Sequence, residues 1–361
     1  MKKVLKLLGI LLLVLLLIVG AYAGYVFGTY ARIEDNQNLH VTHGSAGVKL
    51  ADPGTPYKVL SWNIGFGAYE DDFGFFMDGG TESRAWSKER LSENLDEIGT
   101  LLSAQDADLT LLQEVDFDSD RSYHVDEALK LRTFDDLDVY TDSVFAVNYH
   151  SAYLFYPLTK PHGASNSGLL TVSKLGVRSA VRRSLPVETG VTKLLDLDRC
   201  YSVSRIPVSN GKELCLFDLH LSAYTSDGKI ADEQLELLLS DMQKEFDAGN
   251  YVIGGGDFNK DLLEGGSEAY FGVPTEDYTW AQPIRFDLLE KTDIRLIAPE
   301  GKDAAVPSVR NADGPYHDGQ LVLTVDGFLV SPNVRVTGSE VLDTGFANSD
   351  HNPIVMTVEL E

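Results

Sequence analysis

The strongest hydrophobic feature of the chain lies at its beginning. Lys2, Lys3 and Lys6 precede residues 7–31, a run without a charged side chain in which Leu, Ile and Val predominate. About 20 apolar residues span the hydrocarbon core of a bilayer, and lysines on the N-terminal side favour retention of that end in the cytoplasm. Residues 1–31 are therefore predicted to form a short cytoplasmic start and a single-pass signal anchor in the cell membrane, with the rest of the chain outside the cytoplasm.

A cleaved signal peptide is the alternative for this segment. Ala21, Tyr22 and Ala23 have the small-x-small form that a signal peptidase accepts, so cleavage near Ala23 would give a secreted protein. We favour the anchor because the apolar run continues past that site to residue 31.

The remaining pattern alternates between strand-like and helix-like segments. Residues 32–57 contain Gly, Pro, Asp and Asn without periodicity and are predicted to be a tether, and residues 58–361 form the predicted catalytic-size domain. Helices are indicated after Ser87, a candidate N-cap, and over residues 229–247, where apolar side chains recur every three or four positions. Strands are indicated at residues 59–63, 108–114, 168–173, 199–208, 214–221, 251–253, 321–330 and 354–359. This alternation predicts an α/β domain.

The composition indicates one large domain with an acidic surface. The chain has 361 residues, 43% of them hydrophobic, and a formal net charge of −25 from 30 basic and 55 acidic side chains. Such a surface repels nucleic acid and anionic membranes unless a bound cation or a local basic patch intervenes. No obligate protein partner is indicated, and a monomer is expected.

The two cysteines, Cys200 and Cys215, flank an Asn-Gly hairpin signal. A two-residue turn that pairs Ser209 with Lys212 would place Cys215 opposite Ile206 and the two sulfurs roughly 20 Å apart, too far for a disulfide. Both thiols are therefore predicted to be free.

Several predicted strands end on polar side chains that suit catalysis. The clearest case is the apolar strand that stops at three glycines and is followed by Asp257 and Asn259, which would share one face at the strand end. Other strands end on Asn63, on Glu114 and on His220. Each of these alone is also explained by an ordinary turn or by a structural polar residue, so the set has to be judged together.

The end of the chain adds a buried acid and a histidine. Asp326 interrupts an apolar run, and an unpaired buried carboxylate costs several kcal/mol, so it requires a partner. Asp350 and His351 precede the last strand, and we expect His351 to be that partner.

In this order the motifs resemble those of the endonuclease/exonuclease/phosphatase superfamily, which includes pancreatic-type deoxyribonucleases, abasic-site endonucleases, neutral sphingomyelinases and inositol polyphosphate 5-phosphatases. The resemblance extends from residue 58 to the C-terminus, and the common order of six short motifs makes it specific. The motifs are Ser61-Trp62-Asn63, Leu112-Gln113-Glu114-Val115, His220-Leu221, Gly256-Asp257-Phe258-Asn259, Val325-Asp326-Gly327-Phe328 and Ser349-Asp350-His351-Asn352-Pro353.

The resemblance implies a four-layer α/β sandwich, in which two mixed β-sheets pack face to face with helices on the outside. It also implies hydrolysis of phosphoester bonds with magnesium or manganese, as one or two ions. A divalent cation suits this chemistry because it offsets negative charge at the phosphoryl group. By the same resemblance, Asn63, Glu114 and Asp350 form the metal site.

The resemblance further implies a catalytic set beside the metal. Asp257, helped by Asn259, would orient and deprotonate the attacking water. His351, held by Asp326, would contact the scissile phosphate, and His220 would bind the phosphate or assist the leaving group.

The sequence defines the substrate-binding residues less well. The aromatic loop around Phe75 and Phe76 is either a substrate-facing lip or a cluster folded under the surface. Arg310 either binds a second anionic group or is a solvated loop residue. The pattern assigns no role to Arg121 and His124.

The leading interpretation is a membrane-anchored, extracytoplasmic phosphodiesterase or phosphatase with a phosphoester substrate. A membrane tether raises the effective concentration of lipid head groups and so favours them as substrates. A nuclease acting on DNA or RNA is the alternative, although the acidic surface opposes it. A catalytically inactive module that binds a phosphorylated ligand is the third interpretation, and the complete set of acids argues against it.

Overall fold

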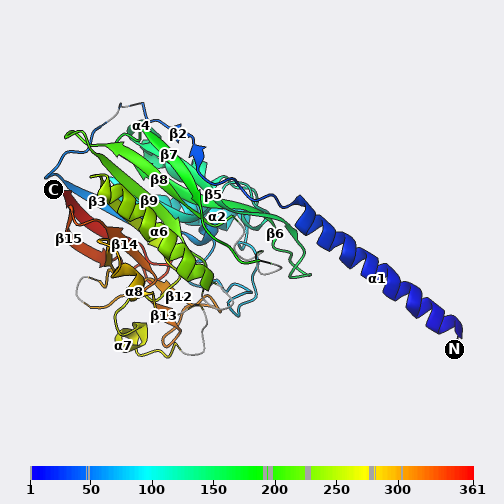
Figure 1. Cartoon of the computed structure of the whole chain (residues 1–361). Helices are drawn as coiled ribbons and strands as arrows, with labels where there is room; N and C mark the ends of the chain where they lie inside the picture. The colour runs from blue at the N-terminus through cyan, green and yellow to red at the C-terminus, as the bar shows by residue number, and fades with distance from the viewer. Residues whose placement is uncertain are drawn as a thin grey trace.

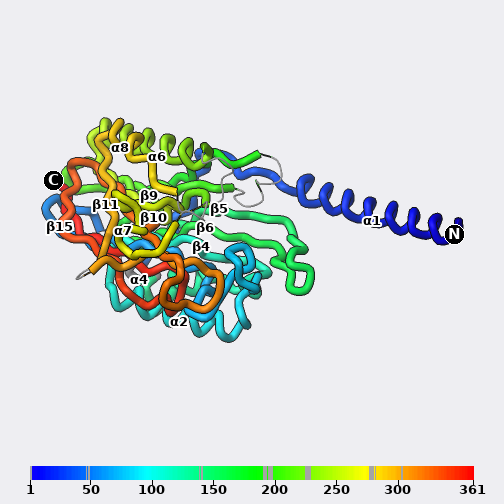
Figure 2. The backbone as a smooth tube through the Cα atoms, turned by 90° about the horizontal axis from the view of Figure 1, so that it is seen from below, coloured from blue at the N-terminus to red at the C-terminus, as the bar shows by residue number. Residues whose placement is uncertain are grey.

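Two seven-stranded sheets pack face to face and carry helices on their outer faces (Figures 1 and 2). The computed structural model describes residues 2–45, 47, 49–189, 193, 198–223, 229–275, 280, 282–301 and 304–361. Figure 2 shows α2 (Lys88–Gln105) and α6 (Lys229–Asp247) on opposite sides of the strands. The predicted four-layer α/β sandwich is therefore confirmed.

The first sheet has the strand order β1-β7-β8-β9-β10-β14-β11. Only the pair of β9 and β10 is parallel among these described strands. The strands are β1 (Gln37–Leu39), β7 (Ser179–Ser184), β8 (Cys200–Pro207), β9 (Glu213–His220), β10 (Tyr251–Asp257), β11 (Arg295–Ile297) and β14 (Asp326–Val330).

The second sheet has the order β15-β16-β3-β4-β6-β5-β2, with β3 and β4 parallel. Its strands are β2 (Val41–Thr42), β3 (Pro56–Asn63), β4 (Leu109–Asp116), β5 (Asp142–Leu154), β6 (Gly163–Ser173), β15 (Val334–Val341) and β16 (Ile354–Leu360). The remaining elements are α1 (Lys2–Thr29), η1 (Gly65–Gly67), η2 (Asp120–Ser122), α3 (Glu127–Arg132), η3 (Phe134–Asp136), α4 (Leu137–Tyr140), α7 (Ser267–Phe271), α8 (Phe286–Leu289) and the paired β12 (Val309–Arg310) and β13 (Val322–Leu323).

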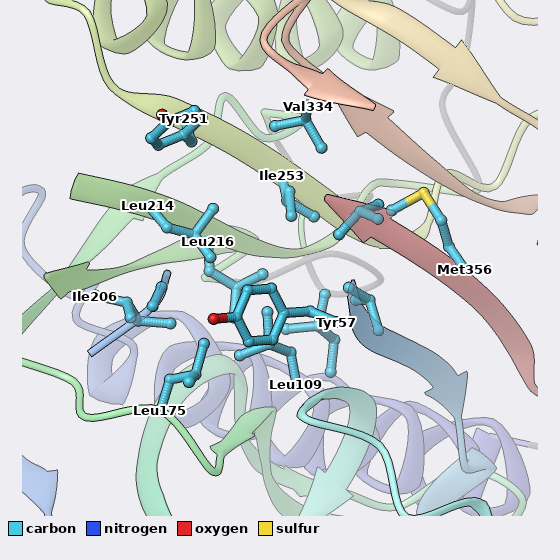
Figure 3. Close-up of a cluster of buried hydrophobic side chains, with 14 of the residues drawn as sticks. Tyr57, Leu109, Leu175, Ile206, Leu214, Leu216, Tyr251, Ile253, Val334 and Met356 are labelled. Carbon is cyan, nitrogen blue, oxygen red and sulfur yellow. The ribbon is translucent and has the colours of Figure 1, made fainter. Parts of the chain in front are cut away.

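Three apolar layers hold the sandwich together. The central one lies between the sheets and includes Leu109, Ile253 and Met356 (Figure 3). The two outer ones lie under α2 and under α6. Strand alternation explains the division, because successive side chains of a strand point to opposite faces. In β9, Phe217 packs toward α6, whereas Asp218 faces the other sheet.

Both predicted long helices are present. The Oγ of Ser87 accepts a hydrogen bond from the backbone N of Arg90 (3.1 Å), so the expected N-cap begins α2. The predicted helix over residues 229–247 matches α6 in both bounds.

Residues 32–57 are more than the tether that we expected. β1 pairs with β7 of the first sheet and β2 pairs with β5 of the second. Strands of three and two residues are too short to show a periodicity of their own, so the sequence pattern does not indicate them.

The predicted hairpin between β8 and β9 exists, but its register is one residue different. Cys215 lies opposite Arg205 rather than Ile206, because the backbone N of Val208 bonds to the O of Lys212 across a three-residue turn. The left-handed Gly211 closes this turn (φ 87°). Both cysteines are buried and free, as predicted.

The helix α1 projects from the body of the protein (Figure 1). It is 28 residues long, and its most apolar 18-residue window has a mean hydropathy of 2.9, so it is long and apolar enough to span a membrane by length and composition. This confirms the apolar helix that the sequence indicates, as a candidate anchor or signal sequence.

Candidate active site

The side chains that the sequence motifs single out meet at one edge of the sandwich. They lie where β3, β4, β9 and β10 end and where β14 and β16 begin. Those that line a pocket of about 500 Å³ are Glu114, His220, Asp257, Asn259, Asp350 and His351. Asn63 and Asp326 lie behind them and are hydrogen-bonded to them. The structure thus brings the whole set together.

Strand pairing explains the meeting of His220, Asp257 and Asp326. Asp257, at the end of β10, is paired with His220 of β9 on one side and with Asp326 of β14 on the other. Gly256 permits this close approach, because its φ is 152° and a Cβ atom there would lie 1.9 Å from the backbone oxygen of Leu219. The glycine at the strand end is therefore a structural requirement of the site.

A β-bulge turns Glu114 into the pocket. The register between β4 and β6 shifts at this point, and Glu114 has a φ of 54°. Asn63, at the end of β3, donates from Nδ2 to Glu114 Oε1 (3.3 Å) and to Asp257 Oδ2 (3.0 Å). Its Oδ1 accepts from the backbone N of Gly65 (3.0 Å). One amide therefore joins acids that belong to different sheets.

Asp257 is fixed by the residues that surround it. The backbone N of Asn259 donates to its Oδ1 (2.7 Å), in a turn where Asn259 adopts the left-handed conformation (φ 50°) that asparagine tolerates. The Nε2 atoms of His220 and His351 lie 3.4 and 3.8 Å from Asp257 Oδ2. This oxygen therefore faces both histidines.

The expected contact between Asp326 and His351 is present. The Nδ1 of His351 lies 2.8 Å from Asp326 Oδ2, which also accepts from the Oγ of Ser308 (2.7 Å). All three side chains are buried. The imidazole is thereby held with its Nε2 directed toward Asp257.

Burial dominates the electrostatics of the site. Desolvation raises the pKa of Asp257 to about 7, with His351 opposing the shift and Asp326 adding to it. Desolvation also raises the pKa of Asp350 to about 7. Burial alone would lower the pKa of His351, but the charges of Asp326, Asp350 and Asp257 outweigh it and raise the pKa to about 10. Burial lowers the pKa of His220 well below its usual range, so one histidine is cationic at neutral pH and the other is neutral.

The acids of the pocket fit a divalent cation. After desolvation, the charge of Glu114 is among the causes that raise the pKa of Asp350, so these carboxylates lie within electrostatic reach of each other. A set of oxygen ligands of this kind suits Mg²⁺ or Mn²⁺. A second group, Asp257, Asp326 and His351, also has ligand atoms within 4.8 Å of one another. In that group the hydrogen bond between Asp326 and His351 already engages two of the three residues.

The aromatic loop and Arg310 differ from our expectations. Phe75 is 8% exposed and packs against Phe76, so the exposed-lip interpretation is wrong for Phe75 and the buried cluster is confirmed. Both rings nevertheless line the pocket. Arg310 is not a solvated loop residue, because it is buried and donates to the backbone oxygens of Glu70 and Phe73 (2.9 and 3.1 Å). Its guanidinium thus fixes the aromatic loop beside the pocket.

Asn148 is a pocket residue that the sequence motifs do not include. It is 2% exposed, and its Nδ2 has no hydrogen-bond partner within the described part of the chain. A sequence signal exists, because Asn148 follows Val144 and Ala146 on the buried face of β5, where an apolar residue is expected.

Arg121, which had no assigned role, also lines the pocket. It is buried, forms an ion pair with Asp116 (2.8 Å) and lies over the ring of Phe66 (4.0 Å). His124 is instead exposed beside Asp118 (2.6 Å). A charge-rich segment gave no means of distinguishing these two residues.

A four-layer sandwich that presents carboxylates, amides and histidines at one edge offers groups that suit the hydrolysis of a phosphoester. The family model described as Endonuclease/Exonuclease/phosphatase family matches residues 60–351, and this chain belongs to that family. Its members are typically hydrolases of phosphoester bonds and generally depend on a divalent metal. No curated protein matches the chain.

Solved structures share the fold at low sequence identity. An endonuclease/exonuclease/phosphatase from Beutenbergia cavernae is 20% identical, with a TM-score of 0.58 over 84% of this chain and 72% of that chain. ANGEL2, a 2',3'-cyclic phosphatase, is 16% identical, with a TM-score of 0.55 over 92% and 100% of the two chains. An endonuclease/exonuclease/phosphatase from Bacteroides vulgatus is 15% identical, with a TM-score of 0.53 over 85% and 100%.

Proposed function

We propose that this protein is a membrane-anchored, extracytoplasmic hydrolase of phosphodiester or phosphomonoester bonds that uses magnesium or manganese, as one or two ions. The convergence of Glu114, Asp257 and Asp350 with the cationic His351 in one pocket carries the proposal. Together they supply groups for a cation, for the proton of an attacking water and for the phosphoryl oxygens.

Glu114 and Asp350 would hold the ion. Asn63 lies between Glu114 and Asp257 and is the third candidate ligand. The bound ion supplies Lewis-acid stabilisation of the charge that develops on the phosphoryl group.

Asp257 is the base of the proposed mechanism. A pKa of about 7 leaves it partly ionised at neutral pH, so its Oδ2 accepts a proton from water as the water oxygen attacks phosphorus. Asn259 keeps this oxygen in place by holding Oδ1. His351 donates from Nε2 to a phosphoryl oxygen while Asp326 holds its Nδ1, and the neutral His220 donates to the phosphate or to the leaving oxygen.

A lipid head-group phosphodiester is the substrate that the surroundings of the site favour. The pocket wall that contains Phe75 and Phe76 continues through Leu154 to Tyr22 of α1. An apolar wall that reaches the candidate membrane helix suits a substrate with an apolar portion better than it suits a polyanionic nucleic acid.

The metal-dependent reaction is tested with Glu114→Gln and with Glu93→Gln, an exposed residue on α2, as the matched control. With the full chain in detergent, we expect Mg²⁺ or Mn²⁺ to raise the unfolding temperature and to support turnover of bis-p-nitrophenyl phosphate in the parent and in the control. Glu114→Gln should lose both effects. Full turnover in the presence of a chelator would refute the mechanism.

The anchor is tested on the N-terminus itself. The full chain should fractionate with membranes and keep its first residues in intact-mass measurements. A mature chain that starts at Gly24 would show a cleaved signal peptide instead.

A further inference from the structure

The most exposed apolar side chains of the body lie together in one hairpin. Phe155, Tyr156 and Leu158 are 51%, 68% and 83% exposed, the three highest values among the large hydrophobic residues that the structure describes outside α1. They belong to the segment 155–162 between β5 and β6, which we call the hairpin tip. Exposure of three such residues within four positions of the chain is costly in water and typical of a surface that binds a partner or a membrane.

The charge pattern around the hairpin tip differs from that of the rest of the protein. The chain contains 55 acidic residues, yet residues 143–187 include no Asp or Glu. This segment covers most of β5, the hairpin tip, β6 and β7. Lys160 within the tip forms an ion pair with Glu82 and is not a free charge. The hairpin itself therefore contributes no carboxylate that would repel anionic lipid head groups.

The hairpin is attached to the helix α1. The hydroxyl of Tyr22 donates to the backbone O of Tyr153 (3.1 Å) and accepts from the backbone N of Phe155 (3.2 Å). The rings of Tyr22 and Phe155 also pack edge to face, with centroids 5.3 Å apart. Both views show the β5–β6 hairpin reaching out from the body on the side of α1 (Figures 1 and 2). Any membrane that contains α1 therefore lies next to this hairpin.

The length of α1 fixes the depth of these contacts. Tyr22 lies 16 residues beyond Lys6, the last lysine of the charged start. At about 1.5 Å per residue this is about 24 Å along the helix axis, less than the hydrocarbon thickness of about 30 Å. If Lys6 marks the cytoplasmic boundary, Tyr22 lies no farther out than the opposite interface, and a helix tilt would place it deeper. Without tilt, Tyr22 lies about 6 Å from the outer interface, where tyrosine is enriched.

We propose that the hairpin tip is seated in the outer interfacial layer of the bilayer that α1 spans, with Phe155, Tyr156 and Leu158 among the lipid head groups. This inference rests on the anchor in the proposed function. Part of the tip's backbone is hydrogen-bonded within the tip, since the N of His162 donates to the O of Tyr156 (3.1 Å) and the N of Lys160 to the O of Pro157 (3.2 Å), and such bonds lower the cost of placing a segment near hydrocarbon. Leu154 and Tyr156 also line the pocket, so the seated hairpin places one wall of the active site at the lipid surface.

The depth of Leu158 tests this inference without any use of catalysis. The full chain carrying Leu158→Cys is labelled with an environment-sensitive fluorophore and placed in phosphatidylcholine nanodiscs, with or without lipids that carry a spin label near the head group. The native cysteines are buried, and the unsubstituted chain measures their background labelling. Tyr270→Cys is the matched control, because Tyr270 is 41% exposed on α7, which both views place away from α1.

We expect the label at Leu158 to emit at shorter wavelength in nanodiscs than the label at Tyr270, and to be quenched by the spin-labelled lipid about twofold more strongly, because an interfacial residue lies within reach of the spin label. Equal quenching of the two labels would overturn the inference. So would a blue-shifted label at Leu158 that the lipid does not quench, because it would indicate a protein surface over the hairpin tip. Turnover of bis-p-nitrophenyl phosphate in the same nanodiscs reports on the proposed function separately.

Discussion

Replacing Asp326 by Asn tests whether His351 needs a charged partner. The Oδ2 of Asp326 accepts from His351 and from Ser308, whereas its Oδ1 is buried without a partner among the described residues. Asparagine has the same volume and keeps one oxygen for both donors, while its amide group takes the position of Oδ1. The substitution therefore removes the charge and leaves the hydrogen bonds.

The expected magnitude follows from this difference. In the parent the hydrogen bond joins two charged groups, whereas in Asp326→Asn only His351 is charged. A charged partner adds about 1–1.5 kcal/mol to a hydrogen bond, so the bond that holds His351 should weaken by about this amount. Because about 1.4 kcal/mol corresponds to a factor of ten, Asp326→Asn should lower kcat/KM about tenfold. Asp326→Ala leaves the donors of His351 and Ser308 unpaired, so it should lower kcat/KM about a hundredfold and destabilise the fold by about 1–3 kcal/mol.

The assay measures turnover of bis-p-nitrophenyl phosphate with Mg²⁺ and unfolding in urea for the same preparations. The stability of Asp326→Asn should stay near that of the parent or rise, since a buried charge is removed. Asp136→Asn, at an exposed position, controls for the loss of one negative charge. A folded Asp326→Asn variant with the kcat/KM of the parent would show that Asp326 serves packing alone.

Three further substitutions test the folded state. Burial lowers the pKa of His162 from 6.5 to about 4, so protonation favours the unfolded chain as the pH falls. The free energy of unfolding of the parent, measured in urea, should therefore fall by about 2 kcal/mol between pH 7 and pH 5, and His162→Gln should not show this loss. Desolvation raises the pKa of Asp218 from 3.8 to about 8, so the charged carboxylate destabilises the folded state more and more as the pH rises from 3.8 to 8. Asp218→Asn should therefore stabilise the protein by about 2 kcal/mol or more at pH 7 and little at pH 4. Gly256→Ala should abolish folding or cost more than about 3 kcal/mol in thermal unfolding, whereas Gly265→Ala, which has a φ of 88° but meets no atom, should cost about 1 kcal/mol.

The members of the site could be predicted because each of them sits at the end of a local pattern. Alternation along the strand that ends at Asp257 indicates its register, and a carboxylate within an apolar run, as at Asp326, demands a partner. Residues that are distant in sequence then meet because strand ends gather at one edge of the sandwich. The contact between Asp326 and His351 follows from this physical requirement and does not depend on the details of loops.

The features that the sequence did not reveal depend on tertiary context. The bulge that turns Glu114 into the pocket is a property of the pairing between β4 and β6, and no residue type in β4 alone predicts it. The burial of Phe75 and of Arg310 is decided by contacts between segments more than 200 residues apart. The hairpin register changed by one residue because Gly211 permits a three-residue turn as readily as the two-residue turn that Asn-Gly favours.

The attachment of residues 32–57 to both sheets affects which substrates the pocket can reach. A flexible tether would only raise the effective concentration of lipid near the site, in any orientation. Here the segment after α1 is fastened to the body: the backbone N of Ile33 donates to Asp198 (2.8 Å), Asp35 accepts from the backbone N of Ser184 (2.8 Å), and β1 then joins the first sheet. Fastening at α1 and at the segment that follows it limits how far the body turns relative to the helix. A preference for membrane-borne phosphoesters would then arise from the orientation of the pocket as well as from proximity, so lengthening the chain between Thr29 and Ile33 with a Gly-Ser insert should weaken the quenching at Leu158 even though the protein stays in the membrane.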